Sequence, residues 1–232
     1  MRAAKKFLTV EGLNRLPRLV HGFGLAGFGL EDLSREPELS SFRPVVMKQL
    51  HSARVFFLDK FPEQQLAGDG LVTASARLLL VIKTADCLPV FLVDPENRAV
   101  AAVHCGWRST HQKILVSAFC LMRENFGSRP GSLLAALGPC IEQKCYEVGP
   151  EVLESFSAAG FDTGRIFIPS DSRDKFCLDL RAANRLLLAD DIGLRPENIL
   201  EMEACTFCSG DLYSYRRDRQ SGRRLINFIG LE

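Results

Sequence analysis

The sequence has few histidines and almost no net charge. Only four of its 232 residues are histidine, and 29 basic residues nearly balance 28 acidic ones, which leaves a formal charge of +1. Without an excess of positive charge, the chain has no overall field that would attract nucleic acid or an anionic membrane. Any anionic ligand must therefore be bound by local arginine and lysine side chains.

Long hydrophobic runs, repeats and low-complexity tracts are also absent. The longest apolar run, LLLVI, is far shorter than the roughly 20 residues of a membrane-spanning helix. The basic start MRAAKKFLTV is not followed by the apolar core and cleavage site of a secretory signal. We therefore predict a cytoplasmic protein, whose eight cysteines are buried thiols, metal ligands or a nucleophile rather than disulfides.

Short apolar runs predict strands through most of the chain. LVTA, LLLVIKT, LPVFLVD and AVAAVH follow one another from residue 71, and SLLAALGPC and RRLINFIGL come later. Helices are predicted at 110–126 with Ser109 or Thr110 as cap, from Pro150, and from Asp179 to Gly193. Residues 31–44, which contain two prolines, are predicted to be a surface excursion. The pattern indicates one α+β domain.

Three side chains that can bind a metal lie where a predicted strand meets a turn. His51 ends KQLH, Cys87 lies in TADCLPV, and His104 ends AAVH. Two imidazoles and a thiolate suit Zn²⁺, and three protein ligands would leave a fourth position for water or substrate, as in catalytic zinc sites. Because the three residues are far apart in the sequence, spacing alone leaves a structural role open for each.

The cysteines offer two competing constellations. Cys140, Cys145, Cys205 and Cys208 would form a four-thiolate structural zinc site, although only the second pair has C-x2-C spacing. The stretch GPCIEQKC contains the Pro-Cys half of a nucleobase deaminase motif, but it lacks the two-residue spacing and the upstream H-x-E. We exclude that deaminase fold and interpret Cys140 and Cys145 as structural thiols.

Sequence blocks along the chain together resemble a known family. KQLHS, GDGLVT, TADCLPVFLVD, AAVHCGWRST, LGPCIEQKCYEVGPEV and CTFCSGDLYSYRRDRQSGR resemble, in order, blocks of the polyphenol-oxidase (laccase) domain family. Its members are also described as multifunctional purine nucleoside phosphorylases and as peptidoglycan editing factors. The blocks span residues 48–223. The resemblance implies a single catalytic domain over residues 1–232, with mixed sheets and flanking helices.

The resemblance also implies a ligand set. The family's zinc-binding catalytic triplet falls on His51, Cys87 and His104, which are therefore predicted to bind zinc and to act in catalysis, with copper as the alternative metal. This chain departs from the family at Cys105, where alanine is usual, and at Ser109, where glycine is usual. Neither departure removes a predicted ligand.

The activities of the family imply a purine nucleoside and phosphate as substrates. They are phosphorolysis of adenosine, inosine, guanosine and methylthioadenosine, and deamination of adenosine. Phosphorolysis needs a cationic cradle, for which Lys48, Arg108, Arg216 and Arg217 are candidates, since guanidinium groups bind phosphate in a bidentate way. Deamination needs an activated water, which a zinc site can supply. The segment SYRRDR is equally consistent with a solvated loop.

Other interpretations stay open from the sequence. A multicopper laccase needs many imidazole ligands, and this chain has four in all. A metal-free cysteine hydrolase that edits peptidoglycan precursors would use Cys87 as nucleophile and His104 or His51 as base. Asp69 and Asp86 either orient a ligand or cap a turn, and Trp107 is more typical of core packing than of a base-stacking platform.

Overall fold

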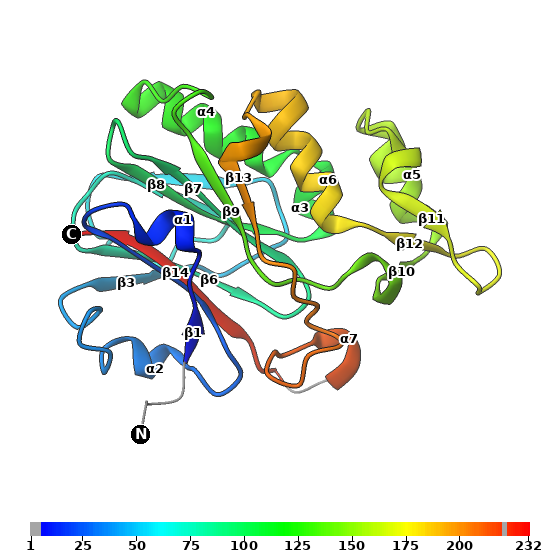
Figure 1. Ribbon diagram of the computed structural model, residues 1–232, viewed down its shortest axis with the longest axis horizontal. Coiled ribbons are helices and arrows are strands. Elements are labelled where there is room, and N and C mark those ends of the chain that lie inside the picture. The colour runs from blue at the N-terminus through cyan, green and yellow to red at the C-terminus, as the bar shows by residue number, and fades with distance from the viewer. Residues whose placement is uncertain (1–5, 220–221) are drawn as a thin grey trace.

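Two sheets face each other across a shared core in the computed structural model, which describes residues 6–219 and 222–232 (Figure 1). The six-stranded sheet has the order β13-β9-β7-β8-β5-β4. Its strands are β4 (Val55–Leu58), β5 (Gly70–Thr73), β7 (Leu88–Asp94), β8 (Ala99–Cys105), β9 (Leu134–Leu137) and β13 (Ile199–Glu201). Both parallel and antiparallel pairs occur, which confirms the mixed α+β fold.

The second sheet has five strands in the order β1-β2-β14-β6-β3. They are β1 (Phe7–Leu8), β2 (Leu19–Gly24), β3 (Arg43–Val46), β6 (Leu78–Thr84) and β14 (Leu225–Leu231). A small third sheet contains β10 (Glu147–Val148), β11 (Phe167–Pro169) and β12 (Phe176–Leu178). The strands predicted from LVTA, LLLVIKT, LPVFLVD, AVAAVH, SLLAALGPC and RRLINFIGL all form, because each is an apolar run long enough to be buried.

Helices cover the outer face of the six-stranded sheet (Figure 1). The covering helices are α3 (Trp107–His111), α4 (Ile114–Phe126) and α6 (Leu180–Leu186), and α6 continues as a π-helical segment (Leu187–Ile192). Helix α5 (Pro150–Ala158) packs against α3 beside the small third sheet (Figure 1). Shorter helices are α1 (Glu11–Asn14), α2 (Leu30–Leu33) and α7 (Tyr215–Asp218). The predicted boundaries of the two later helices are confirmed: Asp179 accepts a hydrogen bond from the Ala182 amide, Pro150 begins α5, and Gly193 ends the π-helical segment with a φ of +89°.

The predicted helix at 110–126 is wrong in its beginning. The chain forms two helices, α3 and α4, because Lys113 between them adopts a left-handed conformation with a φ of +60°. Gly106 rather than Ser109 or Thr110 occupies the N-cap of α3. The Ser109 hydroxyl instead accepts a hydrogen bond from the Gly106 amide at 2.9 Å, so it stabilises the first turn from inside the helix.

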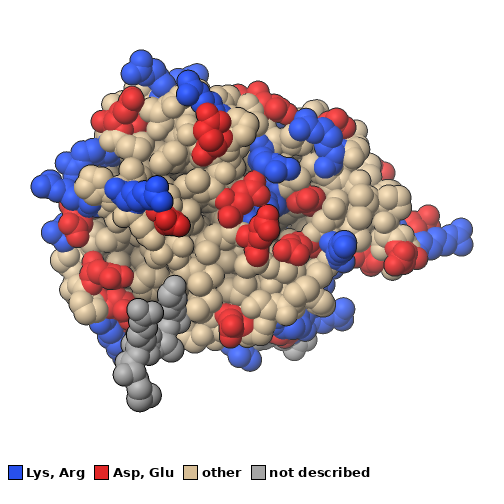
Figure 2. Space-filling view, viewed as in Figure 1, with Lys and Arg blue, Asp and Glu red and all other residues tan. Residues whose placement is uncertain are grey.

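The surface excursion predicted for residues 31–44 has a structural function. Its Leu33, Leu39 and Phe42 are buried against the outer face of the five-stranded sheet, where they join Phe28 and Phe228. A polar segment with two prolines therefore covers a sheet face. Among the described residues, no helix is both long and apolar enough to cross a membrane. Figure 2 shows lysine, arginine, aspartate and glutamate interspersed over one face of the molecule, in keeping with the balanced charge.

Aromatic stacking joins the two sheets. The rings of Phe23 on β2 and Phe91 on β7 lie parallel, with centroids 4.6 Å apart and planes 7° apart, and both side chains are fully buried. A Cβ at Gly138 would lie 2.4 Å from the Phe23 ring, so this position needs a residue without a side chain. The pair fixes how closely the sheets approach each other.

We expect Phe91→Ala to lower the free energy of unfolding by about 3–5 kcal/mol, because the substitution leaves a cavity between the two sheets. Chemical denaturation measures the change. Phe57→Ala is the matched control, since the Phe57 side chain is 39% exposed and its loss should cost far less. Equal effects of the two substitutions would contradict a core that depends on this stacked pair.

Candidate metal and substrate site

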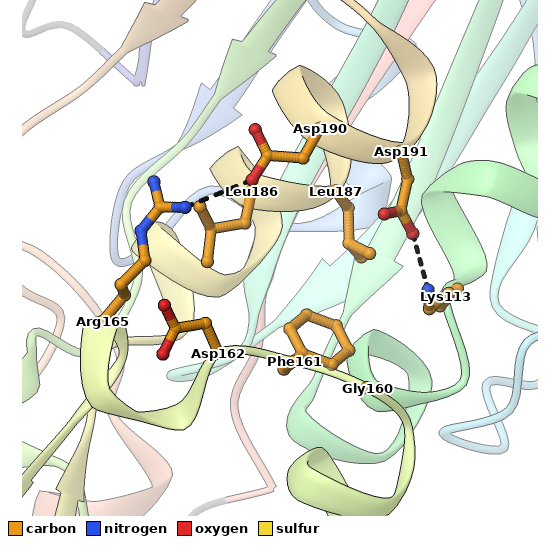
Figure 3. A pocket seen from close by; sticks show the side chains of 9 residues that line it. All are labelled: Lys113, Gly160, Phe161, Asp162, Arg165, Leu186, Leu187, Asp190 and Asp191. Atoms are coloured by element: carbon orange, nitrogen blue, oxygen red, sulfur yellow. Dashed lines mark hydrogen bonds and ion pairs between the residues drawn. The ribbon is translucent and has the colours of Figure 1, made fainter.

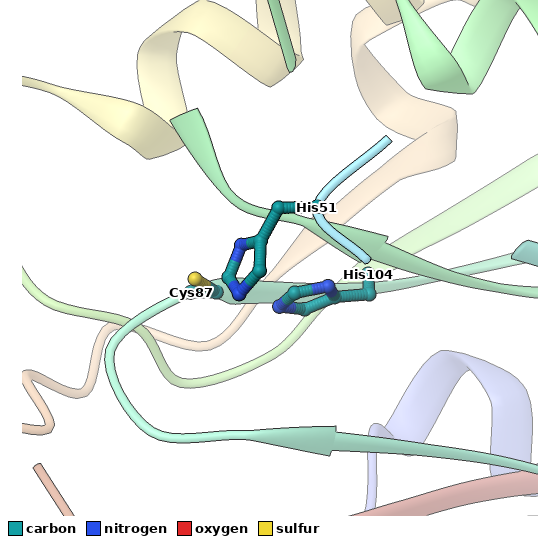
Figure 4. A group of neighbouring side chains, drawn as sticks. All are labelled: His51, Cys87 and His104. Atoms are coloured by element: carbon teal, nitrogen blue, oxygen red, sulfur yellow. The ribbon is translucent and has the colours of Figure 1, made fainter. Parts of the chain in front are cut away.

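Three side chains from different segments converge beside the ends of the two sheets (Figure 4). The ligand atoms of His51, Cys87 and His104 all lie within 4.8 Å of one another. His104 is on β8 and is 2% exposed, Cys87 is half-buried between β6 and β7, and His51 is exposed on the loop between β3 and β4. The site therefore has a buried floor and an accessible rim.

The Asp69 carboxylate holds both histidines in place. It is completely buried and accepts hydrogen bonds from the backbone amides of Leu50, His51 and Ser52 and from the Ser52 hydroxyl, at 2.7–3.1 Å. It also contacts His104 Nδ1 at 2.9 Å. His51 consequently adopts a left-handed backbone conformation, with a φ of +57°. Since Nδ1 of His104 faces Asp69, its Nε2 is left for a ligand.

Electrostatics couple Cys87 to His104. Burial alone would raise the pKa of Cys87, but the charge of His104 and hydrogen bonds from His104 and His51 lower it to about 6. Burial alone would lower the pKa of His104, but Cys87 and Asp69 raise it to about 9. Burial likewise opposes ionisation of Asp69, yet hydrogen bonds from His104 and Ser52 lower its pKa to about 2. Without a metal, Cys87 and His104 therefore form a thiolate–imidazolium pair.

Two neighbours of the triplet are set by strand and turn geometry. Cys105 follows His104 on β8, and because successive strand side chains face opposite sides, it lies in the core beneath the helices. Burial raises the pKa of its thiol well above the ordinary value. At Gly106 a Cβ would lie 2.9 Å from His51 Nδ1 and 3.0 Å from Cys87 Sγ. The absence of a side chain at residue 106 leaves room for the three ligands to meet.

The triplet lies in a cavity of about 780 Å³ that carries positive charge. Five basic residues line this cavity: Lys48, Lys83, Arg108, Arg216 and Arg224. Within the described part of the chain, none of the five forms an ion pair with a carboxylate. Their charges are therefore available to an anionic ligand.

Arg108 and Arg216 are held by contacts with aromatic rings. The Arg108 guanidinium lies 4.2 Å above the Trp107 ring, and that of Arg216 lies 5.4 Å from the Tyr146 ring and donates to the Glu147 carbonyl. Trp107 thus lines the cavity as well as packing against the core. Tyr215, which is 61% exposed, also lines the cavity.

The structure does not bring Arg217 to the cavity with the other predicted phosphate ligands. Its guanidinium donates to four backbone carbonyls of the 206–212 loop and pairs with Asp218 at 2.7 Å. Asp86 accepts hydrogen bonds from the Thr206 hydroxyl and the Arg216 amide, both at 2.7 Å, and so connects this loop to the residue before Cys87. Within the SYRRDR segment, Arg217 therefore stabilises the preceding 206–212 loop and is not available to a ligand.

Sequence reasoning missed Lys83, Arg224, Tyr146 and Tyr215 in the cavity. Lys83 had a detectable signal, because it is the only charge in the otherwise apolar run LLLVIKT. Its backbone pairs with the Gln49 side chain in both directions at 2.8 Å, which places the 48–51 loop beside β6. The aromatic residues gave no such signal, since tyrosine is common at half-buried positions.

A smaller cavity of about 180 Å³ lies near the π-helical segment (Figure 3). Lys113 pairs with Asp191 at 2.8 Å and Arg165 pairs with Asp190 at 3.3 Å, so its charged groups largely satisfy one another. In the cysteine-rich region, the Sγ atoms of Cys145, Cys205 and Cys208 lie within 4.8 Å of one another. The buried Cys140 is not part of this group. The predicted four-thiolate zinc site is therefore wrong in its inclusion of Cys140.

Comparison with known proteins identifies the family. Residues 30–232 match the family described as multi-copper polyphenol oxidoreductase laccase. The chain belongs to this family. The resemblance noted from the sequence blocks is confirmed, and with it the fold. We refer to the group as the laccase family below.

Relatives within the laccase family have enzyme names. The chain is 37% identical over 186 residues to "Adenosine deaminase RL5" from an unknown prokaryotic organism, with 75% of this chain and 69% of the relative covered. It is 36% identical over 223 residues to a "Purine nucleoside phosphorylase" of Deinococcus radiodurans, with 89% and 83% covered. The crystal structure of YlmD from Geobacillus stearothermophilus has a TM-score of 0.88 at 27% identity and covers 100% of this chain and 98% of that one.

We expect Gly106→Ala to weaken zinc binding about 10- to 100-fold while the fold is retained, because the new methyl group would displace His51 and Cys87. Isothermal titration with zinc measures the affinity, in a Cys208→Ser background so that the separate group of Cys145, Cys205 and Cys208 does not contribute. Gly131→Ala is the control, since a Cβ there meets nothing within 4 Å. An unchanged zinc affinity in the Gly106 variant would mean that the three side chains do not share an ion.

In metal-free protein, alkylation of Cys87 should follow a pKa near 6, because the thiolate persists above that value and is lost as the pH falls through it. Peptide mass spectrometry after brief iodoacetamide treatment across a pH series measures the profile. Asp69→Asn removes the partner that raises the pKa of His104, so the profile should shift to higher pH. A wild-type midpoint near the ordinary cysteine value would refute the ion pair.

Proposed function

We propose that this chain is a zinc-dependent purine nucleoside phosphorylase that acts on adenosine, inosine, guanosine and methylthioadenosine and also deaminates adenosine. The observation that carries the proposal is the convergence of His51, Cys87 and His104 in a basic cavity. The names of the laccase-family relatives support the reaction types. The site residues, the metal and the substrates remain predictions that the experiments below test.

The donor set fits zinc. Two imidazoles and one thiol from three segments can contact a single ion, and Asp69 orients the His104 ring, as carboxylates bonded to zinc-binding histidines do in zinc proteins. When bound, zinc would supply Lewis-acid chemistry and lower the pKa of a water molecule. Because His51 is exposed and lines the cavity, one side of the triplet faces the space where a substrate would lie.

The basic residues of the cavity are suited to phosphate. Arg108 and Arg216 are fixed by Trp107 and Tyr146, so little side-chain entropy would be lost when they bind an anion. Lys48 and Lys83 add charge from neighbouring loop and strand. An oxygen of hydrogen phosphate held there would bond to the sugar carbon as the bond from that carbon to the purine nitrogen breaks, and the proton of the phosphate would pass to the departing purine. The basic residues would hold the phosphate beside the oxocarbenium-like sugar that develops.

The aromatic residues suit the purine. Tyr215 exposes most of its ring on α7, and Tyr146 presents a second ring on the wall of the cavity. Aromatic faces bind planar bases by stacking with little preference for their edge groups. This arrangement supports the acceptance of several purine nucleosides by one site.

Copper-dependent phenol oxidation is the activity in the family's description, and the ligand count does not favour it. His21 is buried and accepts a hydrogen bond from the Val10 amide, and His111 stacks on Trp107 at 5.7 Å. Neither histidine joins the triplet, so among the described residues only one group of candidate metal ligands contains histidine. A laccase needs several copper ions bound by many imidazoles.

A second candidate function has a specific observation in its favour. Cys87, His104 and Asp69 lie in the order nucleophile, base and orienting carboxylate, and the metal-free thiol is ionised near neutral pH. This arrangement supports a cysteine hydrolase, for which peptidoglycan precursors are the predicted substrate. Metal dependence separates the two functions, since a sulfur bound to zinc is not a free nucleophile.

We expect the zinc-loaded protein to convert adenosine and phosphate into adenine and ribose 1-phosphate, and, without phosphate, to convert adenosine and water into inosine and ammonia. Arg108→Ala should raise the KM for phosphate about tenfold or more, because a charge-assisted contact is lost, and should leave deamination nearly unchanged. Chromatography of the products measures both reactions, and Arg15→Ala, at an exposed surface position, is the control.

The companion variant Cys87→Ala should abolish both reactions together with zinc binding at the His51, Cys87 and His104 site. If metal-free protein retains full activity and alkylation of Cys87 removes it, the hydrolase is the correct function. If neither form of the protein acts on nucleosides, the phosphorylase proposal is wrong.

A further inference from the structure

A second group of thiols lies outside the substrate cavity. Cys145 ends a short 3₁₀ helix (Gln143–Cys145), and Cys205 and Cys208 lie in the turn that follows β13. The three Sγ atoms lie within 4.8 Å of one another, and those of Cys145 and Cys208 are 3.4 Å apart. None of the three lines the cavity that holds His51, Cys87 and His104.

Backbone contacts hold the two segments together. Cys140 and Cys205 form a parallel bridge, in which the Thr206 amide donates to the Cys140 carbonyl at 3.0 Å and the Cys140 amide donates to the Ala204 carbonyl at 3.3 Å. The Glu142 amide donates to Cys205 Sγ at 3.5 Å. The thiol positions are therefore set by main-chain geometry and do not depend on side-chain rotamers alone.

The distances match a preformed site for a soft cation. Zinc bound tetrahedrally to thiolates at about 2.3 Å separates the sulfurs by about 3.8 Å, which is close to the spacing of this group. Cys205 and Cys208 have the C-x2-C spacing of structural zinc sites. Cys205 is buried, Cys145 is half-buried and Cys208 is exposed, so a fourth ligand position would face solvent.

We propose that Cys145, Cys205 and Cys208 bind a second zinc ion, with water or a small thiol from solvent as the fourth ligand. Each thiol loses its proton on binding, so up to about three protons are released per ion. This site goes beyond the proposed function and does not depend on it, since the two sites share no residue.

The location of the thiol group indicates that the second ion would stabilise the wall of the substrate cavity. Tyr146, next to Cys145, lines the substrate cavity, and Thr206, next to Cys205, donates to Asp86 beside Cys87. An ion shared by Cys145 and the 205–208 turn would join the two segments behind the cavity wall. Zinc at the thiol group therefore stabilises the wall without contacting substrate.

The experiment counts zinc in full-length protein that has been reduced, freed of metal and then titrated with zinc. Cys87→Ala removes the sulfur of the first site, so this variant should still bind about one zinc per chain, and Cys87→Ala with Cys208→Ser should bind none. Cys120→Ser in the same background is the control, because Cys120 lies on α4 away from the group. Circular dichroism verifies that each variant is folded, which we expect because Cys208 is exposed.

Cobalt substitution gives a second readout. Three thiolates produce stronger ligand-to-metal charge-transfer absorption than one, so the spectrum of Cys87→Ala should resemble a three-thiolate site, and Cys145→Ser should weaken it. The proposal is overturned if the folded, reduced Cys87→Ala protein binds no zinc, or if its zinc count is unchanged by Cys208→Ser. Failure of the proposed function would appear separately, as absence of nucleoside turnover with both zinc sites filled.

Discussion

A single buried carboxylate determines the geometry of the candidate site. Asp69 is completely buried and accepts hydrogen bonds from three consecutive backbone amides, from a hydroxyl and from His104 Nδ1. A buried charge is tolerated only when its oxygens are fully satisfied, and here the partners that satisfy it carry both imidazoles of the triplet. The cost of burying Asp69 is therefore offset by the same contacts that position the ligands.

The sequence predicted best those structural features that depend on neighbouring residues in the chain. Apolar runs predicted the strands, because burial on both faces requires continuous hydrophobic residues. The break at Lys113 could not be predicted, since nothing in its neighbours requires a positive φ. Family resemblance gave the triplet, but spacing alone did not, because His51 and Cys87 meet only through the tertiary fold. The function of Asp69 and the internal use of Arg217 depend on backbone groups that leave no trace in residue type.

The sulfur of Cys87 is suited to two incompatible chemistries. As the proposed zinc ligand, Cys87 would donate an electron pair to the ion, and His104 would offer Nε2 to the same ion. Without the ion, that pair of residues becomes a thiolate beside an imidazolium, with Asp69 behind it. One arrangement of side chains thus accounts for both the metal-dependent and the hydrolase interpretations, and the occupancy of the site decides between them.

The last described strand occupies an interior position in its sheet. β14 lies between β2 and β6, with antiparallel pairing on both sides, although some 140 residues separate it from β6 in the chain. During synthesis, β2 and β6 emerge long before β14 and present unpaired edges until it arrives. The nascent chain must therefore remain protected from intermolecular strand pairing until β14 has emerged, because the five-stranded sheet cannot close before then.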